Sequence, residues 1–147
     1  MESKRNKFKI RKVAIENDEW KAQALSVYEN LLFVEPASKH PHAYFAAYKG
    51  RQMAGHSIVL HSDGRWILDG LRVKPEHREQ GIGKALTEAR IRYAVSKGAK
   101  EIWYCCADDN LVTICCHVRF GFKKICPAHH ECSPKTAHWY KLNITTQ

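Results

Sequence analysis

The sequence lacks several features that would assign it to a familiar class at once. No apolar run approaches the ~18 residues of a membrane-spanning helix, so no membrane span is expected. The basic N-terminal segment (residues 1–12) has no apolar stretch after it, which does not fit a secretory signal and favours a cytoplasmic location. Neither of two common nucleotide-binding loops, G-x-x-x-x-G-K-[ST] and G-x-G-x-x-G, occurs.

Metal-ligand spacing is also missing, although the sequence contains six cysteines. No C-x₂-C pair occurs, and two adjacent Cys–Cys pairs are poor spacing for a tetrahedral zinc site. A disulfide framework is not expected without a secretory signal, so buried thiols are the favoured interpretation and no metal site is assigned. Zinc stays open as an alternative because histidines accompany the cysteines. The residues concerned are Cys105, Cys106, Cys115, Cys116, Cys126 and Cys132, with His117, His129, His130 and His138.

Acidic residues are few: 15 Asp and Glu stand against 24 Lys and Arg, which gives a net charge of +9. Such a charge suits a polyanion, a phosphate-rich cofactor or an acidic substrate. The basic residues are scattered except for a cluster between Lys4 and Lys12, and that cluster is typical of a solvated edge strand and tail. A nucleic-acid partner is therefore not expected.

The length of 147 residues fits a single domain, residues 1–147, with an ordinary globular composition. Apolar periodicity predicts elements in the order β-α-βββ-α-β-α-ββ. Glycine-containing turns between the three consecutive strands predict an antiparallel meander, and the strand–helix–strand order after it predicts a parallel pair. The expected strands are 8–15, 43–48, 52–60, 65–73, 101–106, 122–126 and 138–144, and the expected helices are 20–32, 82–94 and 110–119.

The stretch from Val73 to Lys84 carries the clearest chemical signal. Gly81 and Gly83 separate an apolar strand from a helix start, and glycine lets backbone N–H groups converge on one point. The helix N-terminus adds unpaired N–H groups and the positive end of its dipole, while Arg78 and Lys84 add full charges. This arrangement favours a phosphate or pyrophosphate, although a plain strand-to-helix turn would carry the same glycines.

Two motifs resemble those of one protein family. Arg78-Glu79-Gln80-Gly81-Ile82-Gly83 fits the pattern Arg/Gln-x-x-Gly-x-Gly/Ala and resembles motif A of the GNAT superfamily of acyl-CoA-dependent N-acyltransferases. The run from Asn110 to Phe122 resembles a second family motif, with Asn110 and Gly121-Phe122 at the family spacing. The resemblance covers about residues 65–122. It implies an α/β (α+β) fold with a mixed central sheet of about seven strands flanked by helices.

The resemblance further implies that the parallel strands 65–73 and 101–106 splay apart and that the cosubstrate acetyl-CoA lies between them. The end of the first strand would pair with pantetheine, and the loop and helix start would hold the pyrophosphate. A main-chain N–H of the same strand would polarise the acyl carbonyl. The cofactor-binding residues implied in this way are Leu71, Arg72, Val73, Arg78, Glu79, Gln80, Gly81, Ile82, Gly83, Lys84 and Asn110.

Transfer of an acetyl group to an amine requires a base that takes the amine proton. Asp69 is the first candidate, because it is the one acid in an apolar stretch and partial burial would raise its pKa. A solvent-facing strand residue is the competing interpretation. His56, His61 and Glu76 are weaker candidates for the base.

The leaving thiolate calls for an acid, and here the sequence departs from the family. His117 stands where the family carries a tyrosine, and histidine titrates near ~6.5 rather than near ~10. His117 is therefore a candidate acid or a hydrogen-bond donor to the sulfur, or has neither role. Tyr104 and Cys116 are weaker candidates for the acid.

These observations predict an acetyl-CoA-dependent N-acetyltransferase that acts on a primary amine of a small molecule, amino acid or peptide by direct attack on the thioester. A non-catalytic CoA-binding sensor of the same fold and a zinc-stabilised basic binding module are two further classes that the sequence allows. The segments expected around the acceptor, 32–42 and 126–138, carry many histidines and few acids, which disfavours a polycationic substrate. A monomer and a homodimer are both compatible with the sequence.

Overall fold

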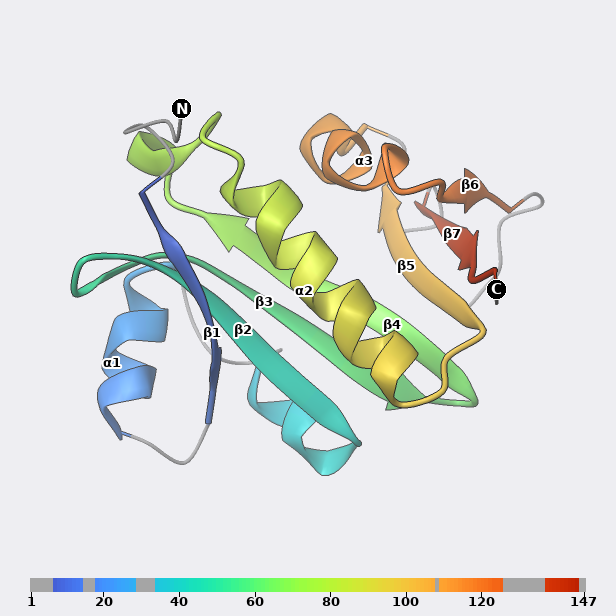
Figure 1. Cartoon of the computed structure of the whole chain (residues 1–147), viewed down its shortest axis with the longest axis horizontal. Helices are drawn as coiled ribbons and strands as arrows, with labels where there is room; N and C mark the ends of the chain where they lie inside the picture. Colours follow the sequence, from blue (N-terminus) through green and yellow to red (C-terminus); the bar gives the residue numbers. More distant parts are fainter. Residues whose placement is uncertain (1–6, 15–17, 29–33, 108, 126–136, 146–147) are drawn as a thin grey trace.

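The computed structural model describes residues 7–14, 18–28, 34–107, 109–125 and 137–145 (Figure 1). In chain order the elements are β1 (Lys9–Val13), α1 (Asp18–Leu25), the 3-10 helix η2 (Glu35–Lys39), β2 (His42–Lys49), β3 (Gln52–Ser62), β4 (Arg65–Val73), the 3-10 helix η3 (Pro75–His77), α2 (Ile82–Ser96), β5 (Glu101–Ala107), α3 (Leu111–Val118), β6 (Lys123–Lys124) and β7 (Ala137–Asn143). The predicted order of helices and strands is confirmed, with two short 3-10 helices added to it.

The strands form one mixed seven-stranded sheet in the order β1-β2-β3-β4-β5-β7-β6. β2, β3 and β4 make the predicted antiparallel meander, β1 pairs antiparallel with β2 at its edge, and β5, β7 and β6 are antiparallel to one another. Only β4 and β5 run parallel, across the helix α2. The predicted fold class is therefore confirmed.

The parallel pair is joined at one end only. β4 and β5 pair at Trp66 with Ile102 and at Ile67 with Trp103, and no later residue of either strand is paired with the other. Beyond this point the two strands diverge, as the family resemblance implied (Figure 1). The separation leaves backbone groups of β4 facing a gap rather than a neighbouring strand.

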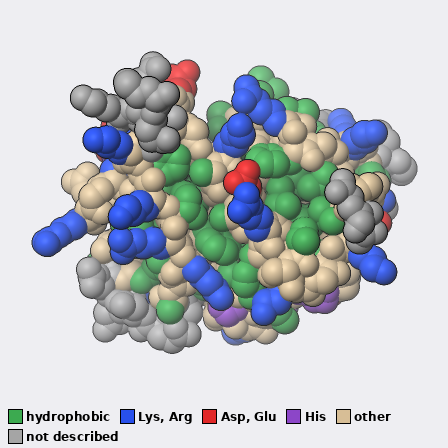
Figure 2. Space-filling view, in the orientation of Figure 1, with side chains coloured by type: hydrophobic (Ala, Val, Ile, Leu, Met, Phe, Trp, Pro, Cys, Tyr) green, Lys and Arg blue, Asp and Glu red, His purple; other side chains and the backbone are tan. Residues whose placement is uncertain are grey.

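Helices cover both faces of the sheet, because the strands alternate their apolar side chains. In β2, Ala43 belongs to the core under α2, whereas Tyr44 belongs to the core that Trp20 and Ala24 of α1 complete. The long helix α2 lies over the face of the meander and runs along its strands, and α3 lies beside the open end of β5 (Figure 1). Figure 2 shows Lys and Arg side chains spread over the α2 face, with few acidic side chains between them.

A bulge interrupts β4 in front of the open end. Three steps of β4, from Arg72 to Asp69, oppose two steps of β3, from His56 to Ile58, so β4 contains one extra residue here. Gly70 lies in the bulge with a φ of 59°, in the left-handed region that glycine enters without a steric penalty. The bulge changes which side chains of β4 face the gap.

The cysteines correct one expectation. Cys105 on β5 is disulfide-bonded, whereas thiols alone were expected; Cys106, Cys115 and Cys116 are thiols. Within the described ranges no three His, Cys, Asp or Glu side chains gather as metal ligands. Cys126, Cys132, His129 and His130, on which the zinc alternative partly relied, lie outside the described residues. No described helix is both long and apolar enough to cross a bilayer.

Candidate active site

A groove of about 610 Å³ runs along the end of β4 and reaches α3. Its apolar wall includes Leu111 and Val112, which are 64% and 67% exposed on the first turn of α3. Exposed large apolar side chains next to a concave surface indicate a binding site. Seven of the predicted cofactor-binding residues line this groove: Leu71, Arg72, Val73, Arg78, Glu79, Ile82 and Asn110.

The loop that begins α2 lies at one end of the groove. Gly81 is the N-cap of the helix with a φ of 84°, and Glu79 also has a positive φ of 60°. No side chain caps the helix, so its first-turn N–H groups, including those of Ile82 and Lys84, are free of a side-chain acceptor. Gln80 accepts a hydrogen bond from Lys49 of β2, which ties the loop to the sheet.

Gly83 also has a packing role that the sequence did not predict. It lies inside the helix without a positive φ, and a Cβ built on it would lie 2.9 Å from Sγ of Cys116 on α3. The missing side chain therefore lets α3 approach α2 closely, rather than letting the loop turn. Asn110 fixes the start of α3 by accepting a hydrogen bond from the N–H of Thr113 at 3.2 Å.

Gly83→Val is expected to lower the free energy of unfolding by about 1–3 kcal/mol, because added bulk at a packed contact forces Cys116 or α3 to shift. Urea denaturation measures the effect. The double variant Gly83→Val with Cys116→Ala removes the opposing sulfur and should recover part of the loss. Additive effects of the two substitutions would show that this contact does not set the distance between the helices.

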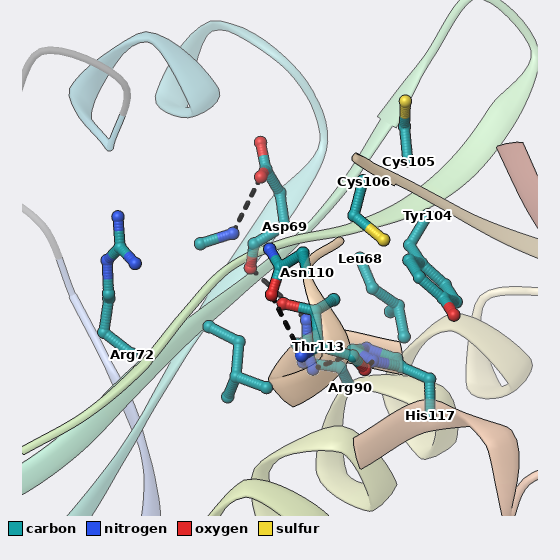
Figure 3. Close-up of a pocket in the computed structure, with 12 residues that line it drawn as sticks. Leu68, Asp69, Arg72, Arg90, Tyr104, Cys105, Cys106, Asn110, Thr113 and His117 are labelled. Carbon is teal, nitrogen blue, oxygen red and sulfur yellow. Dashed lines mark hydrogen bonds between the residues drawn. The ribbon is translucent and has the colours of Figure 1, made fainter. Parts of the chain in front are cut away.

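A second cavity of about 160 Å³ lies in the gap between β4 and β5 (Figure 3). It continues into the groove, because four residues line both: Leu71, Arg72, Asn110 and Thr113. Leu68, Asp69 and Gly70 line it from β4, and Tyr104, Cys105 and Cys106 from β5. Both predicted catalytic residues, Asp69 and His117, lie here.

Asp69 and His117 lie on opposite sides of β4. In Figure 3 the Asp69 side chain points away from His117 and Arg90, which lie together on the α2 side. One carboxylate oxygen of Asp69 accepts a hydrogen bond from the N–H of Gly70 at 2.8 Å. The side chain keeps a solvent-exposed surface, yet the protein around it desolvates the carboxylate and raises its pKa, against the opposing effects of the Gly70 N–H and Arg90.

His117 is buried, 1% exposed, with both ring nitrogens engaged. Its Nδ1 is 2.6 Å from the carbonyl oxygen of Thr113, which only accepts, so Nδ1 carries the proton. Nε2 is then the acceptor for Arg90 Nη2 at 3.3 Å. Burial, together with the charge of Arg90, lowers the pKa of His117 to about 3, so the ring is neutral near pH 7. The ring stacks on Tyr104 with centroids 4.2 Å apart.

Arg90 is a functional candidate that the sequence analysis missed. It projects from α2, is 1% exposed, and lines the cavity between the strands. Nε donates to the carbonyl of Leu86 and Nη1 to the carbonyl of Asp69, both at 3.3 Å. Nη2 donates to Thr87 Oγ1 at 2.9 Å and to His117. Its spacing four residues after Leu86, on the apolar face of the helix, was the signal that could have revealed it.

A second buried pair lies behind the bulge. The hydroxyl of Tyr28 donates to the carbonyl of Gly70 and accepts from His56 Nδ1 at 2.6 Å. Burial lowers the pKa of His56 to about 3, so this ring is also neutral. His56 is 0% exposed and does not line the cavity. This geometry favours a structural role over the base role considered for it.

The weaker candidates for the acid and the base differ in where they lie. Tyr104 lines the cavity but is 2% exposed, and burial raises its pKa, so its hydroxyl is a weak acid. Burial also raises the pKa of Cys116, which lines the groove. His61 packs edge-to-face against Trp66, and Glu76 lies in η3; neither lines the cavity or the groove.

Comparison with known proteins gives one family. The family model of the acetyltransferase (GNAT) family matches residues 9–122, which include both the groove and the cavity. No curated protein sequence matches the chain.

Solved structures with the same fold include an acetyltransferase from Bacillus subtilis in complex with CoA, with a TM-score of 0.75 and 17% identity over 95% of this chain and 100% of that one. A GNAT family acetyltransferase from Elizabethkingia anophelis with acetyl-CoA bound has a TM-score of 0.75 and 12% identity, over 93% and 98% of the two chains. The ribosomal-protein-S18-alanine N-acetyltransferase from Escherichia coli has a TM-score of 0.73 and 18% identity, over 95% and 96%. At these identities the likeness establishes the fold.

Proposed function

Because the chain belongs to the GNAT acetyltransferase family, we propose that it transfers an acetyl group from acetyl-CoA to a primary amine by direct attack on the thioester. The observation that carries this proposal is the gap between β4 and β5, which joins a cavity with a carboxylate to a long apolar groove. Structures of the same fold hold CoA or acetyl-CoA.

The groove has the donors that an acyl-CoA needs. We assign pantetheine to the end of β4, where Leu71 and Val73 line the groove beyond the last residue that pairs with β5. The uncapped first turn of α2 and the N–H groups of residues 79–84 suit a pyrophosphate, with Arg78 and Lys84 as nearby charges. Arg78 Nε also donates to the carbonyl of Val73 at 3.2 Å, which orients its guanidinium along this end of the groove.

Asp69 is the proposed base. Its carboxylate lies on the side of β4 opposite Arg90, so an amine that approaches past Asp69 meets the thioester carbonyl from the face away from α2 (Figure 3). A raised pKa makes the carboxylate a stronger base, and it is the one acidic side chain among the described residues that line the cavity. The same charge attracts an ammonium ion before it loses its proton.

His117 is better explained as a positioning residue than as the acid expected from the sequence. A neutral ring whose Nδ1–H is bonded to Thr113 and whose Nε2 accepts from Arg90 has no proton to give to sulfur. Its position at the end of α3 instead fixes the guanidinium of Arg90. We therefore assign to His117 the orientation of Arg90.

The acceptor is proposed to be a primary amine of a small molecule or of a peptide N-terminus. The Escherichia coli enzyme of this fold acts on an alanine of a ribosomal protein, and a single carboxylate in a small cavity suits one amine rather than a polycation. The cytoplasmic location and the choice between a monomer and a homodimer stay predictions of the sequence.

Calorimetric titration with acetyl-CoA, followed by a thiol-release assay with a panel of amines, tests the function. Binding followed by amine-dependent thiol release is expected. Binding without release from any amine would favour the CoA sensor, and absence of binding would contradict the family-based assignment of the groove.

Two glycine variants sharpen the titration. Gly81→Val forces a β-branched residue to a φ of 84° beside the groove and should weaken acetyl-CoA binding about tenfold or more. Gly64→Val is the matched control, since Gly64 has a φ of 76° in the β3–β4 turn, away from the residues that line the groove. Equal losses of affinity in the two variants would indicate a general effect on folding.

A further inference from the structure

We infer that Arg90 supplies the positive charge that stabilises the departing CoA thiolate, in place of a proton donor. This inference rests on the proposed function and names the residue that completes its reaction. The reaction lacks a proton donor for the leaving thiolate, because the position expected to hold an acid carries a neutral histidine, His117, whose two ring nitrogens are both hydrogen-bonded.

The Arg90 guanidinium lies on the side of the cavity from which the sulfur is proposed to leave. It lines the cavity on the α2 side of β4, opposite the Asp69 carboxylate, together with His117 and Thr113 (Figure 3). The same face joins the groove through Thr113, which lines both spaces. An amine that enters past Asp69 and a sulfur that leaves toward the groove therefore lie on opposite sides of the reacting carbon.

The charge of Arg90 is not neutralised by an ion pair. No carboxylate in the described part of the chain lies within ion-pair distance of it, and its four hydrogen bonds go to two carbonyls, a hydroxyl and an imidazole. A guanidinium has five N–H groups, so one N–H of Nη1 has no acceptor among these partners. Burial lowers the pKa of Arg90 to about 10, and the group is still charged near pH 7.

Burying a cation without an ion-pair partner is costly, and a buried charged group with a shifted pKa that lines a cavity is a candidate functional group. Its field is strong because the surroundings exclude water. Four fixed acceptors also hold the guanidinium in one orientation, so no reorganisation is needed when negative charge develops in front of it.

The proposed step balances without an acid. The amine nitrogen forms a bond to the thioester carbonyl carbon, and its proton passes to Asp69 directly or through water. The C–S bond then breaks, and its electron pair leaves on sulfur as a thiolate next to the Arg90 guanidinium. The products are the amide, the thiolate and one proton, and solvent protonates the thiolate after it leaves.

The test measures the ionisation of the CoA thiol in the complex with the protein, by the ultraviolet absorbance of the thiolate as a function of pH. With Arg90 beside the sulfur, the pKa of the bound thiol should lie about 1–3 below that of free CoA. In Arg90→Met the bound thiol should lose this shift, and kcat should fall about 10²-fold. Arg92→Met on the exposed side of the same helix is the matched control and should keep both.

Arg90→Lys keeps the positive charge but loses the planar guanidinium with its several N–H donors, and it is expected to retain part of the lowering of the thiol pKa. This variant also replaces Arg90→Met in the test if Arg90→Met does not fold. His117→Phe removes one acceptor of the guanidinium and should weaken the shift while leaving CoA affinity unchanged. A bound thiol with the pKa of free CoA in the wild-type protein would overturn the role of Arg90, even with acetyl transfer intact. Failure of CoA to bind at all would instead overturn the proposed function, and this inference with it.

Discussion

Asp69→Asn is expected to lower kcat/KM for amine acetylation by about 10²- to 10⁴-fold, the usual contribution of a positioned general base. Asparagine keeps the shape of the side chain and can still accept from the N–H of Gly70. It has no carboxylate to take the amine proton. Acetyl-CoA affinity should be unchanged, because the groove lies along the end of β4 and the first turn of α3.

The pH profile provides the second readout. Desolvation raises the pKa of Asp69, so the active carboxylate form is lost at a higher pH than for an ordinary aspartate as the solution is acidified. In the wild-type protein kcat/KM should rise with pH through this raised pKa, and in Asp69→Asn that limb should be absent. Glu76→Gln in η3, outside both the cavity and the groove, is the control. Full activity in Asp69→Asn would assign the base elsewhere.

The protein is expected to lose stability steeply in acid, because burial makes two histidines much harder to protonate in the folded protein than in the unfolded chain. His56 and His117 have pKa values near 6.5 in an unfolded chain and about 3 in the folded protein. Between these values the unfolded chain binds more protons, so stability rises with pH through this window and is lost as pH falls through it. Each ring contributes at most about 5 kcal/mol, which is comparable to the whole stability of a small domain.

Urea unfolding across this pH window measures the effect as the slope of the unfolding free energy against pH. His56→Phe removes one titrating ring and should roughly halve the slope, whatever it does to packing. His40→Gln, at an exposed position after η2, is the matched control. A stability that does not change across the window would show that the rings bind protons normally inside the protein.

Elements with strong local signals could be predicted closely. The boundaries of β4 agree with the structure, because turn residues precede the apolar stretch and Pro75 follows it. The predicted helix 82–94 agrees with α2, and Gly98 follows its end with a φ of 91°, as a C′ glycine does. The strand–helix–strand order predicted the parallel pair, and the family resemblance supplied its splaying, which apolar patterning alone does not contain.

Other elements depend on contacts that the sequence does not display. In the helix predicted for residues 20–32, α1 ends at Leu25, where the Ser26 hydroxyl donates to the carbonyl of Gln23 and competes with the helix; residues 29–32 of that prediction lie outside the described residues. Pro36 lies in the first turn of a 3-10 helix in a segment expected to be a loop, because proline fits that position of a helix. Of the strand expected at residues 122–126, the described part (122–125) contains only the two residues of β6, and residue 126 lies outside the described residues.

At the candidate site, the sequence identified which residues lie there but not the electrostatic environment around them. His117 was found by its position in a motif, yet its neutral state depends first on burial and then on the charge of Arg90, which lies 27 residues away in the sequence. Arg90 itself was not predicted from the sequence, because a charged residue on a helix is expected to face water. The bulge at Gly70 likewise follows from pairing with β3, and single-strand periodicity does not reveal it.

Because β4 diverges from β5, the two sides of the fork are held together mainly by a shared hydrophobic core, which includes Leu68 of β4, Ala94 of α2 and Ile102 of β5. The meander and the strands β5–β7 are joined in the sheet by only two residue pairs, with α2 as the crossover between them. A ligand bound between β4 and β5 contacts both sides of the fork and raises the free energy of unfolding, by ~2.7 kcal/mol at a ligand concentration of ~100 times Kd. The heat resistance of this chain is therefore coupled to the supply of its acyl donor.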